Sequence, residues 1–306
     1  MALNKRFNFG PWTIRYQLLG AVEKYDRTVV FVHGTPWSSA VFRPMTDVLA
    51  ALGGYRILLY DLAGFGHSQA LDTSMSNTQV DTSVKTQAQL LFELLKHLRM
   101  DGSSPNTAPD VIAHDIAGTI ALRAHLVHEC QFRSLCLLDT NTVLPWGDGF
   151  YKLVRSEPDT FRKLPPAIFE AMVRAVIRSA CHNPKNLDSG WERTLAEPWI
   201  YSSIADADQT TGQDSFVRQI AQANDADIAE MLDQNMYEKV QCPVKILWGE
   251  QDQWIPREKM DRLAEMLKHC LKEFVVIPEA GHLVMIDQPV RVASEIFVWL
   301  DEQPIA

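Results

Sequence analysis

Short apolar segments alternate with segments of helical spacing along most of the chain. The apolar segments predict strands at FNFGPWTIRYQLLG, which divides into two strands around the Gly10-Pro11 turn, and at RTVVFVHG, YRILLYD, DVIAHD, FRSLCLLD, CPVKILWG and KEFVVIPE. Helical spacing predicts helices over Val80–Leu98, Ile116–His128, Arg257–Lys268 and Pro289–Glu302. Fully apolar strands that alternate with helices are typical of a mostly parallel sheet covered on both faces, so the predicted fold class is α/β.

The alternation lapses between about Asn141 and Ala229, where LPPAIFEAMVRAVIRSA is the clearest amphipathic helical segment. Because apolar strands resume after this region, we interpret it as a helical cap inserted into one core rather than as a second independent domain. The predicted division is a core of residues 1–140 and 229–306 with a cap of residues 141–228. A cap over the carboxyl edge of a sheet excludes water and shapes a pocket.

Composition and charge exclude several classes of function. The 306 residues are 46% hydrophobic and 22% charged, which is ordinary for a folded domain, and the net charge of −9 argues against nucleic-acid binding. Five cysteines without CxxC pairing favour free thiols in a reducing compartment over disulfides or a zinc site. No apolar run approaches membrane-spanning length and the first residues carry no signal-like segment, so we expect a cytoplasmic protein, monomeric or homodimeric.

Polar and charged residues follow the predicted strands. Parallel sheets bind ligands beyond the carboxyl ends of their strands, so these residues are the first candidates for a functional site: His33, Asp61, Asp115, Asp139, Asp252 and His282. Any one of them alone is more often a helix cap or a turn residue. Their order and their neighbours decide the interpretation.

The segment DVIAHDIAGTIALR places Asp115 between a predicted strand and a predicted helix. Ala113, Ala117 and Gly118 surround it with very small side chains. A sharp strand-to-helix turn that raises a reactive side chain requires such neighbours, whereas a plain surface turn does not. This pattern favours a reactive carboxylate over a simple helix cap.

Five motifs in one order resemble the α/β-hydrolase superfamily. AHDIAG matches its nucleophile elbow, LWGEQDQWIP its acid loop and IPEAGHLVMIDQP its histidine loop, while FVHGTPWSS and DLAGFGHS resemble its oxyanion turn and the turn beside it. The motifs extend over nearly the whole chain. With an aspartate in the place of the usual serine, the chain resembles the aspartate-nucleophile branch of epoxide hydrolases and dehalogenases.

The resemblance implies a catalytic triad of Asp115, Asp252 and His282. An aspartate is already ionised near neutral pH and attacks an sp³ carbon directly, which gives an alkyl–enzyme ester. His282 would then activate water, Asp252 would orient the imidazole, and the backbone amides of Thr35 and Ile116 would hold the oxyanion. Glu250 or Asp139 remain alternatives to Asp252, and His33 and His114 are interpreted as structural.

The leaving group is less clearly indicated. Ile116 and Thr35 stand where halide-leaving relatives commonly carry tryptophan and asparagine, and Ile116 and Thr119 stand where fluoroacetate-type enzymes carry arginines. Epoxide hydrolases protonate the ring oxygen with tyrosines of the cap, for which the candidates here are Tyr151 and Tyr201, with Tyr237 just beyond. We therefore favour opening of a small hydrophobic epoxide to a diol.

Two alternatives stay open. One is hydrolytic dehalogenation of haloalkanes or haloacids, with an indole N–H as halide donor, for which the candidates are Trp37, Trp146, Trp191 and Trp199. The other is a lyase, a cofactor-free oxygenase or a non-catalytic small-molecule receptor on the same fold. No metal or organic cofactor is expected, because the histidines lack ligand spacing and no glycine-rich dinucleotide motif follows the first parallel strand.

Overall fold

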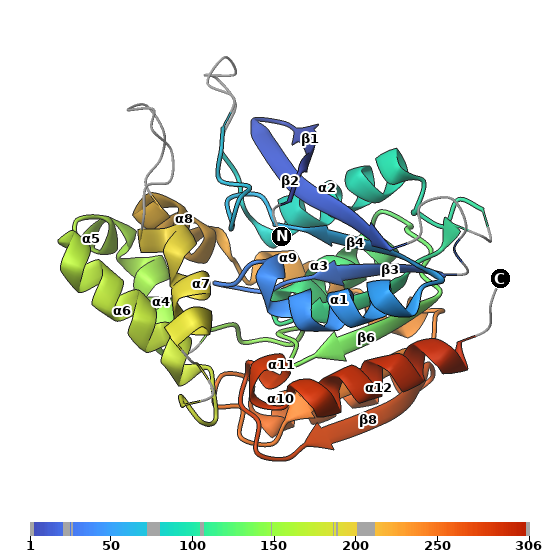
Figure 1. Ribbon diagram of the computed structural model, residues 1–306. Coiled ribbons are helices and arrows are strands. Elements are labelled where there is room, and N and C mark those ends of the chain that lie inside the picture. The colour runs from blue at the N-terminus through green and yellow to red at the C-terminus, as the bar shows by residue number, and fades with distance from the viewer. Residues whose placement is uncertain are drawn as a thin grey trace.

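A single mixed sheet forms the centre of the computed structural model (Figure 1). The structure describes residues 3–20, 25, 27–71, 80–104, 107–147, 149–185, 187, 189–200 and 212–303. The strands are β1 (Lys5–Phe9), β2 (Trp12–Gly20), β3 (Arg27–Val32), β4 (Tyr55–Tyr60), β5 (Asp110–His114), β6 (Ser134–Leu138), β7 (Val244–Gly249) and β8 (Leu271–Ile277). Each predicted strand is present within a residue or two of its expected place.

The strand order is β1-β2-β4-β3-β5-β6-β7-β8. Strands β1 and β2 form an antiparallel hairpin, β2 pairs antiparallel with β4, and all strands from β4 to β8 run parallel. Every residue of β3, β5, β6 and β7 is buried, as expected for parallel strands covered on both faces. The loops that follow these strands therefore converge at one edge of the sheet.

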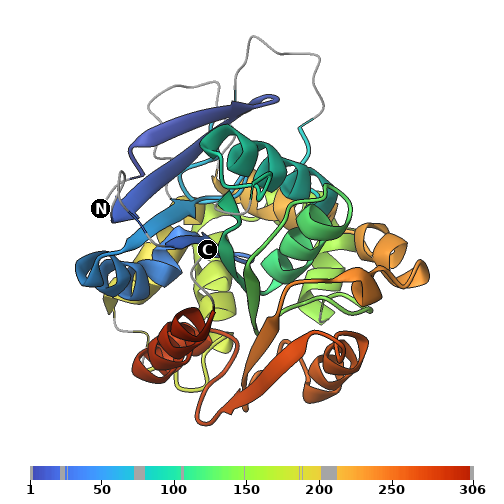
Figure 2. The ribbon, with the colours of Figure 1, turned by 90° about the vertical axis from the view of Figure 1, so that its right-hand side faces the viewer.

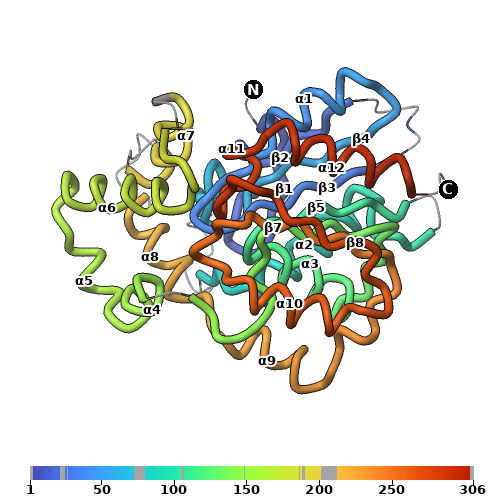
Figure 3. The backbone as a smooth tube through the Cα atoms, turned by 90° about the horizontal axis from the view of Figure 1, so that it is seen from below, coloured from blue at the N-terminus to red at the C-terminus, as the bar shows by residue number. Residues whose placement is uncertain are grey.

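Helices cover both faces of the sheet. The described helices are α1 (Arg43–Leu52), α2 (Val84–Leu98), α3 (Ile116–Leu126), α4 (Gly149–Ser156), α5 (Pro158–Arg162), α6 (Pro166–Ser179), α7 (Ser189–Ile200), α8 (Gly212–Gln222), α9 (Ala226–Asp233), α10 (Arg257–Met266), α11 (Val284–Asp287) and α12 (Pro289–Glu302). Helices α1 and α12 lie on one face, and α2, α3, α9 and α10 lie on the other (Figures 2 and 3). None of the described helices is both long and apolar enough to span a bilayer.

Two local details differ from the expectation. Helix α2 begins at Val84 rather than at Val80, because the Ser83 side chain accepts a hydrogen bond from the Thr86 amide and caps the helix there. Helix α1, which follows a short 3₁₀ turn at Ser39–Phe42, was not predicted.

Helices α4 to α8 gather beyond one end of the sheet, at the left of Figure 1. They belong to the region 141–228, whose described residues contain no strand. The Trp199 indole N–H of α7 donates to the Pro36 carbonyl 2.9 Å away, in the loop after β3. This contact places the helices above the loops that follow the parallel strands, where the predicted site lies.

Candidate active site

Asp115 occupies a strained turn between β5 and α3. Its backbone has φ 56° and ψ −128°, a conformation that costs a residue other than glycine of order 1–3 kcal/mol. Three backbone hydrogen bonds hold the turn: the Asp115 amide donates to the Leu138 carbonyl at 3.1 Å, and the Asp115 carbonyl accepts from Gly118 at 3.0 Å and Asn141 at 3.1 Å. The elbow geometry predicted from the sequence is present.

Small residues are required around this turn because other chain segments approach it closely. A β-carbon on Gly34 would lie 2.4 Å from the Asp115 β-carbon, and one on Gly118 would lie 2.7 Å from the Thr140 β-carbon. Neither position accepts a side chain without displacement of its neighbours. The elbow is therefore packed from the β3 loop on one side and from the β6 loop on the other.

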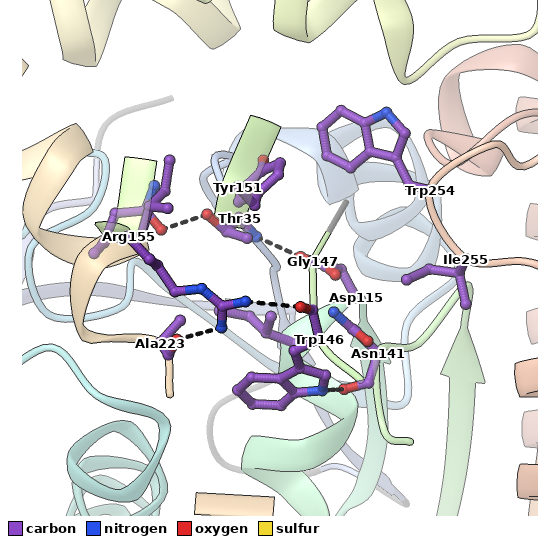
Figure 4. A pocket seen from close by; sticks show the side chains of 13 residues that line it. Thr35, Asp115, Asn141, Trp146, Gly147, Tyr151, Arg155, Ala223, Trp254 and Ile255 are labelled. Atoms are coloured by element: carbon purple, nitrogen blue, oxygen red, sulfur yellow. Dashed lines mark hydrogen bonds between the residues drawn. The ribbon is translucent and has the colours of Figure 1, made fainter. Parts of the chain in front are cut away.

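The two oxygens of the Asp115 carboxylate have different surroundings (Figure 4). The Thr35 amide donates to Oδ2 at 2.8 Å, and the Ile116 amide also hydrogen-bonds to the carboxylate. Oδ1 lies 3.8 Å from His282 Nε2, which is too far for a hydrogen bond. Oδ2 is thus held by the Thr35 amide, while Oδ1 faces the imidazole.

Burial raises the pKa of Asp115 to about 6, while His282 and the amides of Thr35 and Ile116 act in the opposite direction. Asp115 is 3% exposed, so the ionised carboxylate has lost nearly all contact with solvent. The group is ionised at neutral pH but only just, because the loss of hydration outweighs its hydrogen bonds. A poorly solvated carboxylate of this kind is a stronger nucleophile than one in water.

His282 is fixed by Asp252. Its Nδ1 lies 2.9 Å from Asp252 Oδ2, and the other oxygen of Asp252 accepts from the amides of Trp254 at 2.7 Å and Ile255 at 3.0 Å. Burial lowers the pKa of His282, but the Asp252 carboxylate outweighs it and the net pKa is raised. Within the described residues, His282 Nε2 has no hydrogen-bond partner, so the nitrogen that faces Asp115 is available for a proton.

Asp139, the alternative acid, has different contacts. It follows β6, is fully buried, and accepts a hydrogen bond from the Gly249 amide at 2.7 Å through Oδ1. Burial and the nearby Asp252 carboxylate raise the pKa of Asp139 well above its ordinary value. The carboxylate that hydrogen-bonds to the His282 ring is that of Asp252, not that of Asp139. The raised pKa of Asp139 favours its protonated form.

His114 and His33 make structural contacts, in agreement with their interpretation from the sequence. His114 Nε2 hydrogen-bonds to the His282 carbonyl at 2.8 Å, and the two rings lie 4.7 Å apart. Burial lowers the pKa of His114 well below its ordinary value, so it packs as a neutral ring under His282. His33 Nε2 accepts from the Leu62 amide at 3.0 Å and so joins the loops after β3 and β4.

A pocket with about 520 Å³ of space not occupied by atoms opens over Asp115. Its walls are mainly apolar, with contributions from the core loops and from α4 and α8: Thr35, Asp115, Ile116, Asn141, Trp146, Gly147, Tyr151, Arg155, Gln219, Ile220, Ala223, Trp254 and Ile255. Four of the candidate residues besides Asp115 line it, namely Thr35, Ile116, Tyr151 and Trp146. Figure 4 shows Tyr151 and Trp254 on one side of the pocket and Asn141 beside Asp115.

The other candidates for the leaving group are placed differently. Trp37 does not line the pocket; it stacks on Trp254 at 5.7 Å, and Trp254 in turn stacks on His282 at 4.8 Å. The indole N–H groups of Trp146 and Trp199 donate to backbone carbonyls, and the Tyr237 hydroxyl donates to the Thr142 carbonyl. Tyr201 lies outside the described residues.

Sequence reasoning did not single out four residues that line the pocket: Asn141, Arg155, Gln219 and Trp254. Arg155 Nη2 donates to the Trp146 carbonyl at 2.7 Å and Nη1 to the Ala223 carbonyl at 2.9 Å, so it ties α4 to the segments on either side (Figure 4). Trp254 had one signal in the sequence, its position two residues after Asp252. No three metal-ligating side chains gather into a cation site in the parts of the chain that the structure covers.

Comparisons with known proteins agree with this geometry. The model of the alpha/beta hydrolase family matches residues 29–295. Lipase 3 of Moraxella sp. (strain TA144) is 23% identical over 89% of this chain and 77% of its own length, and epoxide hydrolase 3 of Xenopus tropicalis is 21% identical over 94% and 75%. The crystal structure of an alpha/beta hydrolase fold protein from Burkholderia ambifaria is 31% identical, covers 97% of this chain and 98% of its own, and superposes with a TM-score of 0.82.

Proposed function

This chain is a hydrolase that belongs to the alpha/beta hydrolase family, and we propose that it opens small hydrophobic epoxides to diols through a covalent ester on Asp115. The observation that carries the proposal is the state of the Asp115 carboxylate. One oxygen is held by the Thr35 amide, and the other lies 3.8 Å from His282 Nε2 at the wall of an apolar pocket. A carboxylate so placed is a nucleophile for an sp³ carbon, whereas the same attack on an ester would give an anhydride.

In the first step Asp115 Oδ1 forms a bond to an epoxide carbon, and the carbon–oxygen bond of the ring breaks. The electron pair passes to the ring oxygen, which takes a proton from a phenol. Tyr151 is the tyrosine that lines the pocket, and we assign this proton transfer to it. Apolar walls disfavour free alkoxide in this space, which makes the proton donor necessary.

In the second step His282 Nε2 removes a proton from water, and the water oxygen adds to the Asp115 carboxyl carbon. The amides of Thr35 and Ile116 then hold the oxyanion on Oδ2, and each such donor contributes about 3–4 kcal/mol in comparable sites. Collapse of this intermediate breaks the bond between the carboxyl carbon and Oδ1 and releases the diol, which takes the proton back from His282. The second proton of the water remains on the regenerated Asp115 carboxyl group and passes to the Tyr151 phenolate, which restores both side chains. Asp252 keeps the imidazole oriented and balances its charge throughout.

The change of charge on Asp115 links the two steps. The ionised Asp115 carboxylate is one of the groups that raise the pKa of His282. Esterification removes this charge, so the pKa of the imidazole falls in the intermediate. His282 thus becomes a neutral base at the point in the cycle where a base is required.

A single turnover in H₂¹⁸O with excess enzyme tests the proposal, with styrene oxide as substrate. We expect one heavy oxygen in the Asp115 peptide and none in the diol, because water attacks the enzyme ester rather than the substrate. The Asp115→Asn variant is the control and should show neither turnover nor label. Heavy oxygen found at once in the diol, with an unlabelled Asp115 peptide, would refute the covalent route.

Displacement of halide is the second candidate, and one observation favours it. The Trp37 indole N–H is buried and has no hydrogen-bond partner among the residues that the structure describes. An unpaired indole donor is suited to a halide ion, although Trp37 stands behind Trp254 rather than in the pocket wall. Turnover of 1-bromobutane faster than that of styrene oxide would select this function, and turnover of esters alone would exclude both.

A further inference from the structure

The side chains of Thr35, Asn141 and Gln219 add polar groups to the mainly apolar wall of the pocket. Thr35 donates to Gln219 through its hydroxyl and to the Asp115 carboxylate through its amide, and the Asp115 carbonyl accepts from the Asn141 amide. The proposed chemistry uses the Thr35 amide but has no role for the two carboxamides. Polar groups that are buried in a pocket without a partner lower stability, so their presence indicates a ligand that pairs with them.

Gln219 presents a buried hydrogen-bond donor. It lies on α8 and is 2% exposed. The Thr35 hydroxyl donates to Gln219 Oε1, which fixes the carboxamide against the loop after β3. The amide nitrogen Nε2 is left without a hydrogen-bond partner in the described chain. A buried amide nitrogen without a partner costs about 1–3 kcal/mol, a cost that a ligand atom can remove.

Asn141 presents a buried acceptor in the same pocket. Its backbone amide donates to the Asp115 carbonyl at 3.1 Å, and its carbonyl accepts from Thr119 Oγ1 at 2.8 Å and from the Trp146 indole at 2.9 Å. The backbone is therefore locked beside the elbow. The side-chain oxygen Oδ1 is buried and, over the residues covered by the structure, has no hydrogen-bond partner.

We propose that Gln219 and Asn141 together bind a hydroxyl group that the substrate carries next to its reactive carbon. A hydroxyl both accepts and donates, so it pairs with the Gln219 amide nitrogen and the Asn141 oxygen at once. If both carboxamides are rotated by 180°, their oxygen and nitrogen atoms exchange places, and the hydroxyl still finds one donor and one acceptor. The oxygen of an epoxide ring only accepts and would leave Asn141 unpaired. The preferred substrate class is then a short 2,3-epoxy alcohol, a conclusion that rests on the proposed epoxide opening.

The test compares glycidol with 1,2-epoxybutane, which differ only in a hydroxyl against a methyl group of similar size. We expect kcat/KM of the wild-type enzyme to favour glycidol by about tenfold or more. The Gln219→Met variant keeps the side-chain length and removes the donor, so this ratio should fall toward one. Ser215→Ala is the matched control, because it removes a buried hydroxyl from α8 one turn away, outside the pocket.

The outcomes separate this inference from the function on which it rests. Equal kcat/KM for the two epoxides in the wild-type enzyme would overturn the inference without any variant. Equal slowing of both epoxides in Gln219→Met would also overturn it, because the amide would then serve the ring oxygen. If the wild-type enzyme opens neither epoxide and Asp115 stays unlabelled in H₂¹⁸O, the proposed function itself fails.

Discussion

Replacement of Asp115 by asparagine is expected to abolish turnover and, at the same time, to stabilise the protein at neutral pH. Asparagine has nearly the same shape as aspartate, and its oxygen can still accept from the Thr35 amide. What it removes is a negative charge at a site that is 3% exposed. The effect on stability therefore reports the cost of keeping that charge inside the protein.

The size of this effect on the free energy of unfolding follows from the raised pKa of Asp115. Asp115 has a pKa of about 6 in the folded protein and 3.8 as the ordinary value. The folded state thus binds the proton more tightly than the unfolded state, and this stability is complete below pH 3.8 and is lost as the pH rises through about 6. By linkage the loss is about 1–2 kcal/mol at pH 5 and about 3 kcal/mol at pH 8. The attraction of His282 is already contained in the pKa of Asp115.

Urea unfolding of the wild-type protein and of Asp115→Asn at pH 5 and pH 8 measures this difference. We expect the variant to be more stable than the wild-type protein, and its advantage in the free energy of unfolding to grow by about 1–2 kcal/mol from pH 5 to pH 8. Other groups titrate in both proteins and largely cancel in the comparison. An advantage that does not change with pH, or a variant that is less stable at pH 8, would refute the view that Asp115 is a strained, poorly solvated carboxylate.

Four further results are expected. First, kcat/KM should fall as the pH drops below about 6, because protonated Asp115 cannot attack; a profile that stays flat to pH 5 would contradict the assigned pKa. Second, His282→Gln should form the ester but not hydrolyse it, so intact-mass spectrometry should find the substrate mass on the peptide with Asp115; an adduct elsewhere would contradict the assigned roles. Third, Tyr151→Phe should slow epoxide opening at least about a hundredfold while sparing 1-bromobutane, and equal loss on both would exclude Tyr151 as the acid. Fourth, Gly34→Ala should destabilise the fold by about 1–3 kcal/mol in urea unfolding, because its β-carbon would meet Asp115. Gly149→Ala is the control and should be nearly neutral, because its β-carbon meets no atom within 4 Å.

The strands and the elbow were predictable because they depend on local sequence. Buried parallel strands such as β5 and β6 consist of apolar residues throughout, so their pattern is visible without knowledge of their partners. The small residues around Asp115 reflect a steric requirement of the same segment. The motifs around Asp252 and His282 predicted that these two residues lie together, and the structure places their side chains 2.9 Å apart.

The walls of the pocket could not be predicted, because they depend on contacts between distant segments. Thr35 and Gln219 are separated by 184 positions, and the amphipathic pattern of α8 predicts only that Gln219 is near its buried face. Trp254 stacks on His282 through a loop conformation that periodicity does not contain. The choice between Asp252 and Asp139 likewise required the positions of two carboxylates relative to one ring.

Thr35 bonds to two parts of the molecule at once, since its amide holds the Asp115 carboxylate and its hydroxyl holds Gln219 of α8. A displacement of α8 is therefore transmitted through one residue to the donor that polarises the nucleophile. Helix α8 and the turn at Asp115 are thus connected through Thr35. The position of the helix that lines the pocket and the hydrogen bond to the carboxylate depend on the same residue.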